Sequence, residues 1–106
     1  MQKINDKTGI QWNMRLHTVW MGMTQTKREA FCEKIGTSMG HVPQIMYGHK
    51  PTRITLAINM DKETKGEIPM WESRPDVDWD YVLKALKRRE RILKHGQQQV
   101  AVQADS

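Results

Sequence analysis

The sequence of 106 residues has a single cysteine, one phenylalanine and no long hydrophobic run. Because one thiol cannot form an internal disulfide, the cysteine content is typical of a reducing compartment. No apolar stretch approaches the roughly 18 residues of a membrane-spanning helix. The first seven residues also lack the apolar segment of a signal peptide. We therefore expect a cytoplasmic protein that has no membrane partner.

Catalytic and cofactor-binding motifs are also missing. Neither the phosphate-binding pattern G-x-x-x-x-G-K-[ST] nor the dinucleotide-binding pattern G-x-G-x-x-G occurs. The four histidines and Cys32 do not have the spacing of zinc ligands. Cys32 falls on the predicted inner side of a helix, which indicates a packed thiol rather than a nucleophile. We expect a protein that is not an enzyme and that uses no cofactor and no metal.

Positive charge is in excess along the chain. Lysine and arginine together number 17 against 12 aspartates and glutamates, which gives a formal net charge of +5 at pH 7. A basic balance of this size favours a polyanionic partner, nucleic acid before membrane. Many proteins are mildly basic, so charge alone does not identify that partner.

Apolar residues recur at helical spacing, and no segment has sustained period-two alternation. Capping residues and glycines divide this pattern into separate helices. We expect an all-α fold, a compact helix-turn-helix bundle of four or five helices plus a longer C-terminal helix. The second helix begins at Thr24 or at Thr26, which has capping-box spacing with Glu29. The predicted helices span 13–21, 24–35 or 26–35, 38–47, 52–63 and 78–95, with a helical turn within 68–71.

These helices suggest a division of the chain into four parts. Residues 1–12 are polar and are expected to form a flexible N-terminal arm. Residues 13–77 form the predicted DNA-binding domain, and residues 78–95 form the C-terminal helix. Residues 96–106 are polar and weakly patterned, so we expect a disordered tail.

Residues 28–47 contain the parts of a helix-turn-helix motif. Two short helices must face each other with apolar sides, and a small residue such as Cys32 is needed where they cross. Gly36 suits the tight turn between them. The inward-facing residues are Phe31, Ile35, Val42 and Ile45. The pattern predicts that the second helix enters the major groove of DNA, and a plain helical hairpin within a bundle is the alternative.

Four segments in order carry a family resemblance. They are REAFCEKIGTS at 28–38, QIMYGHKP at 44–51, LAINMDKETKG at 56–66 and RPDVDW at 74–79. Together they resemble the YdaS-like antitoxin family, relatives of the Cro-type repressors, over residues 14–79. The resemblance implies a compact repressor-type fold of four or five helices. It also implies a DNA-binding regulator of phages, prophages and mobile modules that acts on its own promoter.

The resemblance places four residues near the start of the recognition helix, where side chains reach base edges. They are Met39, Gly40, Pro43 and Gln44. Gln44 alone has a bidentate group suited to adenine, while Met39 suits a thymine methyl group. Pro43 departs from the family pattern. Because proline disfavours a helical conformation at Val42, either the helix is kinked or its regular part starts at Pro43.

Polar and basic residues around this helix suit contacts with DNA phosphates. They are Ser38, His41, His49, Lys50, Thr52 and Arg53. Ordinary surface charge is the alternative for His49, Lys50 and Arg53.

The C-terminal helix at 78–95 combines six basic and three acidic residues with an apolar stripe. The stripe consists of Trp79, Val82, Leu83, Leu86, Ile92 and Leu93. Because helix-turn-helix proteins usually read two half-sites, we expect the stripe to form the interface of a homodimer. A helix docked on its own domain is the alternative.

The sequence therefore predicts a sequence-specific regulator that binds double-stranded DNA, a repressor acting on an operator. The alternative is an antitoxin or regulatory adaptor whose C-terminal helix binds a toxin or a second regulator protein. An RNA-binding module is a weaker alternative, because the interleaved exposed aromatic and basic residues that stack RNA bases are missing.

Overall fold

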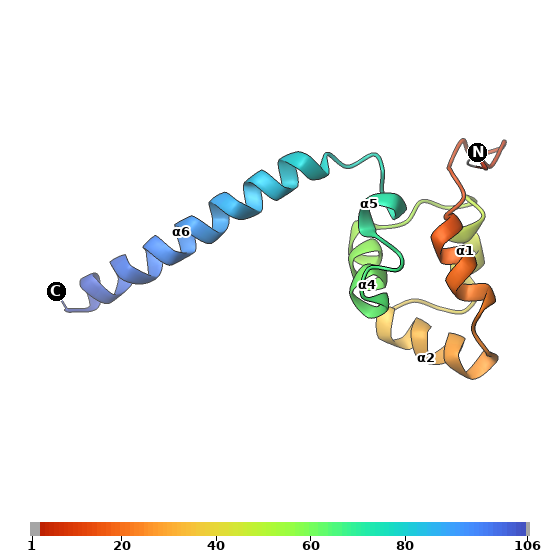
Figure 1. Cartoon of the computed structure of the whole chain (residues 1–106), viewed down its shortest axis with the longest axis horizontal. Helices are drawn as coiled ribbons and strands as arrows, with labels where there is room; N and C mark the ends of the chain where they lie inside the picture. Colours follow the sequence, from red (N-terminus) through yellow and green to blue (C-terminus); the bar gives the residue numbers. More distant parts are fainter. Residues whose placement is uncertain (1–2, 106) are drawn as a thin grey trace. The chain divides into compact units, whose positions relative to one another are not determined.

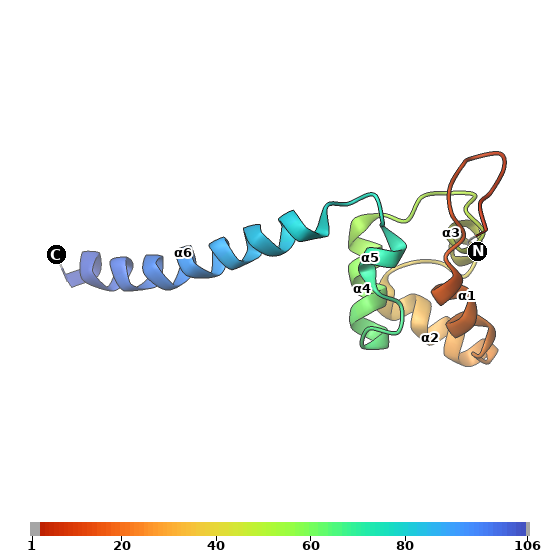
Figure 2. The same ribbon diagram turned by 45° about the horizontal axis from the view of Figure 1, so that its top comes forward.

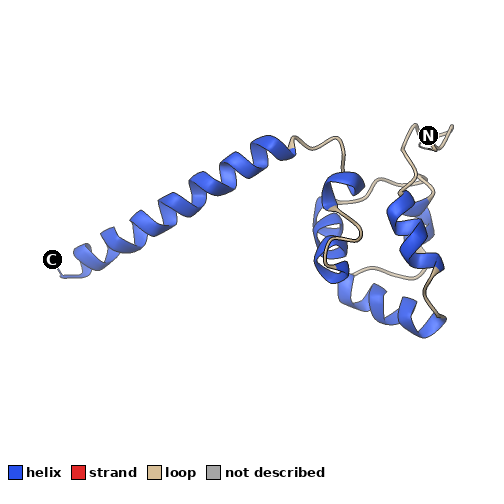
Figure 3. Ribbon diagram, in the orientation of Figure 1, coloured by secondary structure: helices blue, strands red, loops and turns tan. Residues whose placement is uncertain are grey.

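The structure is a computed structural model that describes residues 3–105, with side chains as far as His95. The described residues form an all-helical bundle followed by one long helix, and their only strand-like pairing is an isolated bridge between Ile4 and Gln11 (Figures 1 and 3). The prediction of an all-α fold is confirmed. The helices are α1 (Met14–Met21), α2 (Gln25–Ile35), α3 (His41–Met46), α4 (Ile54–Thr64), α5 (Met70–Ser73) and α6 (Trp79–Asp105).

The chain divides into two compact units, residues 1–75 and residues 76–106. The first unit holds α1 to α5, and the second holds α6. The predicted boundary after residue 77 lies two residues beyond the observed one. Within the described part of the chain, no helix has both the length and the apolar composition needed to cross a bilayer.

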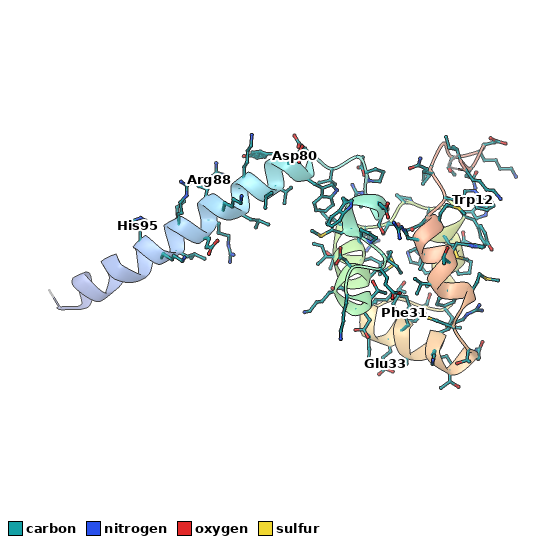
Figure 4. All side chains as sticks on the ribbon, in the orientation of Figure 1. Trp12, Phe31, Glu33, Asp80, Arg88 and His95 are labelled. Atoms are coloured by element: carbon teal, nitrogen blue, oxygen red, sulfur yellow. The ribbon has the colours of Figure 1, made fainter. Side chains whose placement is uncertain are left out.

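Buried apolar side chains from α1 to α4 and from the segment before α5 form the core of the first unit. Figure 4 shows Phe31 on the inner side of α2 and Glu33 on its outer side. The predicted inward-facing residues of the motif are all buried. The core consists of Leu16, Trp20, Phe31, Cys32, Ile35, Val42, Ile45, Met46, Leu56, Met60 and Ile68.

Local capping signals explain where the first two helices begin. The Asn13 Oδ1 atom accepts a hydrogen bond from Leu16 N at 3.0 Å, so α1 starts as predicted. The Thr24 hydroxyl accepts from Lys27 N at 3.2 Å, which makes Thr24 the cap of α2. The capping box proposed for Thr26 is therefore wrong, because Thr26 already lies inside the helix.

Two later helices differ from the prediction. Helix α4 begins at Ile54 rather than Thr52 and ends at Thr64, because Lys65 already adopts a left-handed conformation with φ 54°.

Helix α6 begins where the Asp78 carboxylate accepts from Tyr81 N at 3.1 Å, as predicted. It then continues through Gly96 to Asp105, so the predicted end at His95 and the disordered tail over 96–105 are wrong. The glutamines and alanines that follow Gly96 are good helix formers, and no proline interrupts them. Ser106, also predicted disordered, lies outside the described residues.

The N-terminal residues are not a flexible arm where the structure describes them. Residues 3–12 form a closed loop, in which Asn5 N donates to Ile10 O at 2.8 Å and Trp12 N donates to Lys3 O at 2.7 Å. Figure 2 shows this loop beside α3. The arm prediction failed because the loop is held by polar and backbone groups, which leave no apolar pattern in the sequence. Its residues 1 and 2 lie outside the described part.

Candidate nucleic-acid interface

The turn between α2 and α3 has a glycine at its first residue. Gly36 takes a left-handed conformation with φ 80°, and its N–H donates to Cys32 O at 3.0 Å. This closes α2 as the sequence predicts. The Ser38 hydroxyl accepts from His41 N at 3.1 Å, but the helix itself starts only at His41. Ser38 was predicted to be the N-cap of this helix, whereas the structure places the cap at Gly40, two residues later.

Pro43 is accommodated by this later start. It is the third residue of α3, and the first N–H groups of a helix have no intrahelical acceptor. The proline therefore removes no hydrogen bond from α3. The sequence left two alternatives, a kinked helix or a regular helix that starts at Pro43. The second is closer to the structure, but the helix starts at His41, two residues before the proline.

The four predicted base-reading residues have different surroundings. Gly40 is exposed, and a Cβ atom added there would meet no atom within 4 Å. Pro43 and Gln44 are half-buried on α3. Met39 instead packs against the core, with its Sδ atom 3.6 Å from the Cys32 thiol. Met39 is therefore largely a packing residue, and its predicted outward position is wrong.

Most of the predicted phosphate-contacting residues are accessible. Ser38, His49, Lys50 and Arg53 are exposed, and His41 is half-buried. Thr52 is the exception, because only 6% of its surface is exposed. Its backbone carbonyl accepts a hydrogen bond from the Arg74 guanidinium at 3.2 Å, which ties this segment to the chain after α5. The predicted contact between the Thr52 hydroxyl and phosphate is wrong.

The C-terminal end of α3 is held by residues 3–13, which we call the N-terminal brace. Three donors of the brace reach three successive backbone carbonyls at and just beyond the end of the helix. The bonds run from Asn13 N to Met46 O (2.9 Å), from Asn5 Nδ2 to Tyr47 O (3.1 Å) and from Thr8 Oγ1 to Gly48 O. The carbonyls of 43–45 accept from N–H groups of 47–50. Each carbonyl from 43 to 48 therefore has a donor, although α3 has only six residues.

Gly48 allows the brace to approach this closely. Its φ of 72° lies in the left-handed region, and a Cβ atom added there would lie 2.5 Å from Ile10 O. Both the backbone conformation and the space therefore require glycine.

Aromatic contacts complete the brace. The Trp12 and Tyr47 rings meet edge to face with centroids 4.9 Å apart, and Lys3 Nζ lies 4.9 Å from the Trp12 ring centre. Figure 4 shows Trp12 between the N-terminal loop and the start of α1. Asn5, Thr8 and Trp12 were not among the residues predicted from the sequence. The run Asn5 to Gly9, with its asparagine and glycine, carried a turn signal that could have marked a closed loop.

The second unit exposes apolar residues on α6. Leu83, Leu86 and Leu93 are each about half exposed or more, at 53%, 52% and 47%. At 100° per residue, Leu86 and Leu93 lie on one face, whereas Ile92 lies about 120° away from Leu86. Ile92, at 60% exposure, therefore does not belong to the predicted stripe. Trp79 and Val82 are half-buried.

The charged side chains of α6 are exposed between Asp80 and His95. Lys84, Lys87, Arg88, Arg91 and Lys94 share one broad face at helical spacing. Figure 4 shows Arg88 and His95 projecting from α6. The Glu90 carboxylate pairs with Lys94 at 3.5 Å.

Cys32 is the one thiol of the chain, and it is 3% exposed. Desolvation by burial raises the pKa of this thiol above its ordinary value. In the described part of the chain, no group of three or more histidine, cysteine or carboxylate side chains could hold a metal ion.

In comparisons with known proteins, no family model matches the chain, and no curated protein or solved structure is significantly similar to it. The resemblance to the YdaS-like antitoxins remains a prediction from the sequence.

Proposed function

We propose that this chain is a sequence-specific regulator that binds double-stranded DNA in the cytoplasm, a repressor at a promoter of a phage, prophage or mobile element, and that it is not an enzyme. The observation that carries the proposal is the arrangement of α2, the turn and α3. A short helix with an accessible N-terminal turn follows a glycine turn, and basic residues lie directly after it.

In this proposal, the first turn of α3 enters the major groove. Gly40 lets the backbone approach the bases, and the Gln44 amide reads an adenine edge. Lys50 and Arg53 contact phosphates, and Ser38 adds a hydroxyl. Arg53 caps α4 without a side-chain hydrogen bond, so the first N–H groups of α4 are available to a phosphate.

Binding to DNA is tested by fluorescence anisotropy with DNA from upstream of the gene and random DNA of equal length. We expect an affinity gap of at least about 10³-fold, the lower end for specific binders. Raising the salt concentration should weaken both complexes, with a slope of about −0.9 per phosphate neutralised. Equal affinity for both DNAs would contradict a regulator of its own promoter.

Base reading by Gln44 is tested by Gln44→Ala. Discrimination between operator and random DNA should fall by about 1–3 kcal/mol. Gln25→Ala is the control, because Gln25 is an exposed glutamine on α2 outside the predicted reading set. If the operator and random DNA lose affinity equally in Gln44→Ala, Gln44 does not read a base.

We also propose that the chain is a homodimer through the stripe of Leu83, Leu86 and Leu93 on α6. Dimers bind two half-sites about one helical turn apart, which suits a small DNA-binding unit. Leu86→Glu should convert the dimer to a monomer in sedimentation equilibrium and weaken operator binding. Ile92→Glu makes the same charge change at an exposed position off the stripe and should leave the dimer intact.

The exposed leucines of α6 also favour the second candidate, an antitoxin or adaptor that binds a toxin or another regulator. Unchanged self-association and operator binding in Leu86→Glu, with loss of a copurifying protein, would favour the adaptor. Loss of both dimer and operator binding would favour the repressor.

A further inference from the structure

The Asn5 side chain joins the brace to His49, and its orientation is fixed by its own loop. The Asn5 Oδ1 atom accepts from Lys7 N at 3.0 Å and from Thr8 N at 3.3 Å. The other end of the amide, Nδ2, lies 3.1 Å from Tyr47 O and 3.2 Å from His49 Nδ1. A flipped amide would place its oxygen against the Tyr47 carbonyl and its NH₂ against two N–H donors. The four contacts therefore agree on one orientation.

This orientation decides which nitrogen of His49 carries the proton. An amide NH₂ group can only donate, so Nδ1 of the neutral imidazole must accept. The proton of the neutral ring is then on Nε2. The His49 side chain is exposed, and its backbone N–H is held by Gln44 O at 2.8 Å. The backbone N–H and the Nδ1 atom of His49 are therefore both held by hydrogen bonds, and Nε2–H is the one N–H donor of the ring.

We propose that Asn5 is a positioning residue of the DNA interface, which holds His49 in the Nε2–H tautomer so that this N–H donates to a backbone phosphate. The proposal rests on the proposed DNA-binding function. His49 directly precedes Lys50, and both are exposed beside the end of α3. The two residues then contact phosphates in different ways. Lys50 contributes charge and releases counterions, whereas His49 in its neutral form contributes a hydrogen bond without added charge.

The tautomer is measured without DNA, by long-range proton–nitrogen NMR spectra of the full chain. The spectra are recorded at alkaline pH, where imidazole side chains are neutral. In the wild-type protein the His49 cross-peaks should show the Nε2–H form. Asn5→Asp keeps an oxygen for Lys7 N and Thr8 N but replaces the NH₂ donor by an acceptor. This variant should shift His49 to the Nδ1–H form.

Two further variants separate positioning from a general loss of the loop. Thr8→Val removes the hydrogen bond to Gly48 O without touching His49, so the tautomer should stay Nε2–H. If Asn5→Asp does not fold, Asn5→Ser removes the amide NH₂ that faces His49, and its shorter side chain keeps an oxygen for the loop. The spectra should then show a mixture of tautomers. A wild-type ring that already shows a mixture, or the same tautomer in all variants, would overturn the positioning role.

The phosphate contact is tested by a double-mutant cycle in operator binding. His49→Ala should weaken binding about tenfold, the effect of one hydrogen bond to a charged group. Asn5→Ser should weaken it by less, because part of the His49 population keeps the Nε2–H form. The double variant should be no weaker than His49→Ala alone, because Asn5 acts through His49. The salt dependence should keep its slope in both variants, whereas Lys50→Ala should reduce it by about 0.9.

Other outcomes would overturn the proposal. Additive losses in the cycle would mean that Asn5 does not act through His49. A changed tautomer without loss of affinity would mean that His49 does not contact phosphate. If the wild-type chain binds no DNA, the proposed function fails and the phosphate contact fails with it, while the NMR spectra still decide whether Asn5 sets the tautomer.

Discussion

Helices α3 and α6 are stabilised in different ways. Contacts with the rest of the fold stabilise α3, whereas hydrogen bonds within the helix stabilise α6. Helix α3 has six residues, three of them buried, and its end is held by hydrogen bonds from residues more than 30 positions away in the sequence. Helix α6 has 27 residues, and most of its described side chains are exposed. Six residues are too few for an autonomous helix, whereas a long helix propagates its own hydrogen bonds. The geometry of α3 is therefore fixed by the fold, whereas most of the described side chains of α6 remain exposed.

The largest expected difference between the two units is in the free energy of unfolding that is lost when one leucine in each is replaced by alanine. Leu16→Ala removes a side chain with 0% exposure and should lower the free energy of unfolding by about 2–5 kcal/mol. Leu86→Ala removes one that is 52% exposed and should change it by less than about 0.5 kcal/mol at low protein concentration. Urea denaturation measures both. Equal losses would mean that α6 is packed in the monomer.

The dependence of α3 on its brace can be measured with two glycines. Gly36 and Gly48 both have positive φ, at 80° and 72°, but only Gly48 faces a close neighbour, Ile10 O at 2.5 Å. Gly36→Ala should cost about 1–2 kcal/mol for the left-handed conformation alone. Gly48→Ala should cost at least about 3 kcal/mol, because the brace must also move. If the two losses in thermal unfolding are equal, the brace does not press against Gly48.

The length of α6 can be tested at Gly96. Because this glycine lies inside the helix, Gly96→Ala should stabilise α6 by about 0.5–1 kcal/mol. Far-ultraviolet circular dichroism should show higher helical content. An unchanged spectrum would favour the earlier expectation of a helix that ends at His95.

The smallest expected effect concerns Cys32 in the core. Burial raises the pKa of its thiol, so the folded chain keeps the proton at a pH where the unfolded chain loses it. This contribution to stability is fully present below the unfolded thiol pKa of about 8.5 and is lost as the pH rises above it. Denaturation at a series of pH values should show the decline in the wild-type protein. Cys32→Ala should lack this decline, even though the variant is less stable at every pH.

Local signals in the sequence were sufficient for much of the fold. Asn13, Gly36 and Asp78 each act on residues within one helical turn, so the boundaries they set could be predicted. Some of the predictions that failed depend on tertiary contacts. The Thr52 carbonyl accepts from the Arg74 guanidinium, 22 residues away, and Met39 packs against the core with its Sδ atom 3.6 Å from the Cys32 thiol.

Prediction of the candidate site from local sequence signals was limited in the same way, and to a greater extent. The choice of Gly40 and Gln44 follows from the family resemblance, and that of Lys50 follows from its place after the motif. Gly40 and Lys50 are exposed, and Gln44 is half-exposed. The brace could not be predicted, because Asn5 meets Tyr47 across 42 residues and no apolar pattern links them. The sequence of a short polar loop is compatible with many hydrogen-bond partners, and only the three-dimensional structure shows which of them the loop contacts.

If the chain reads DNA as proposed, the way the brace holds α3 has a consequence for how the target sequence could change during evolution. Asn5, Thr8 and Asn13 all donate hydrogen bonds to the backbone carbonyl oxygens of 46–48, and every amino acid has such an oxygen. The outward residues of the helix can therefore be exchanged without altering the bonds that keep it in place. A lineage could acquire a new operator through substitutions at Gly40 or Gln44 while residues 3–13 stay constant, and a designer could graft new reading residues onto the same support.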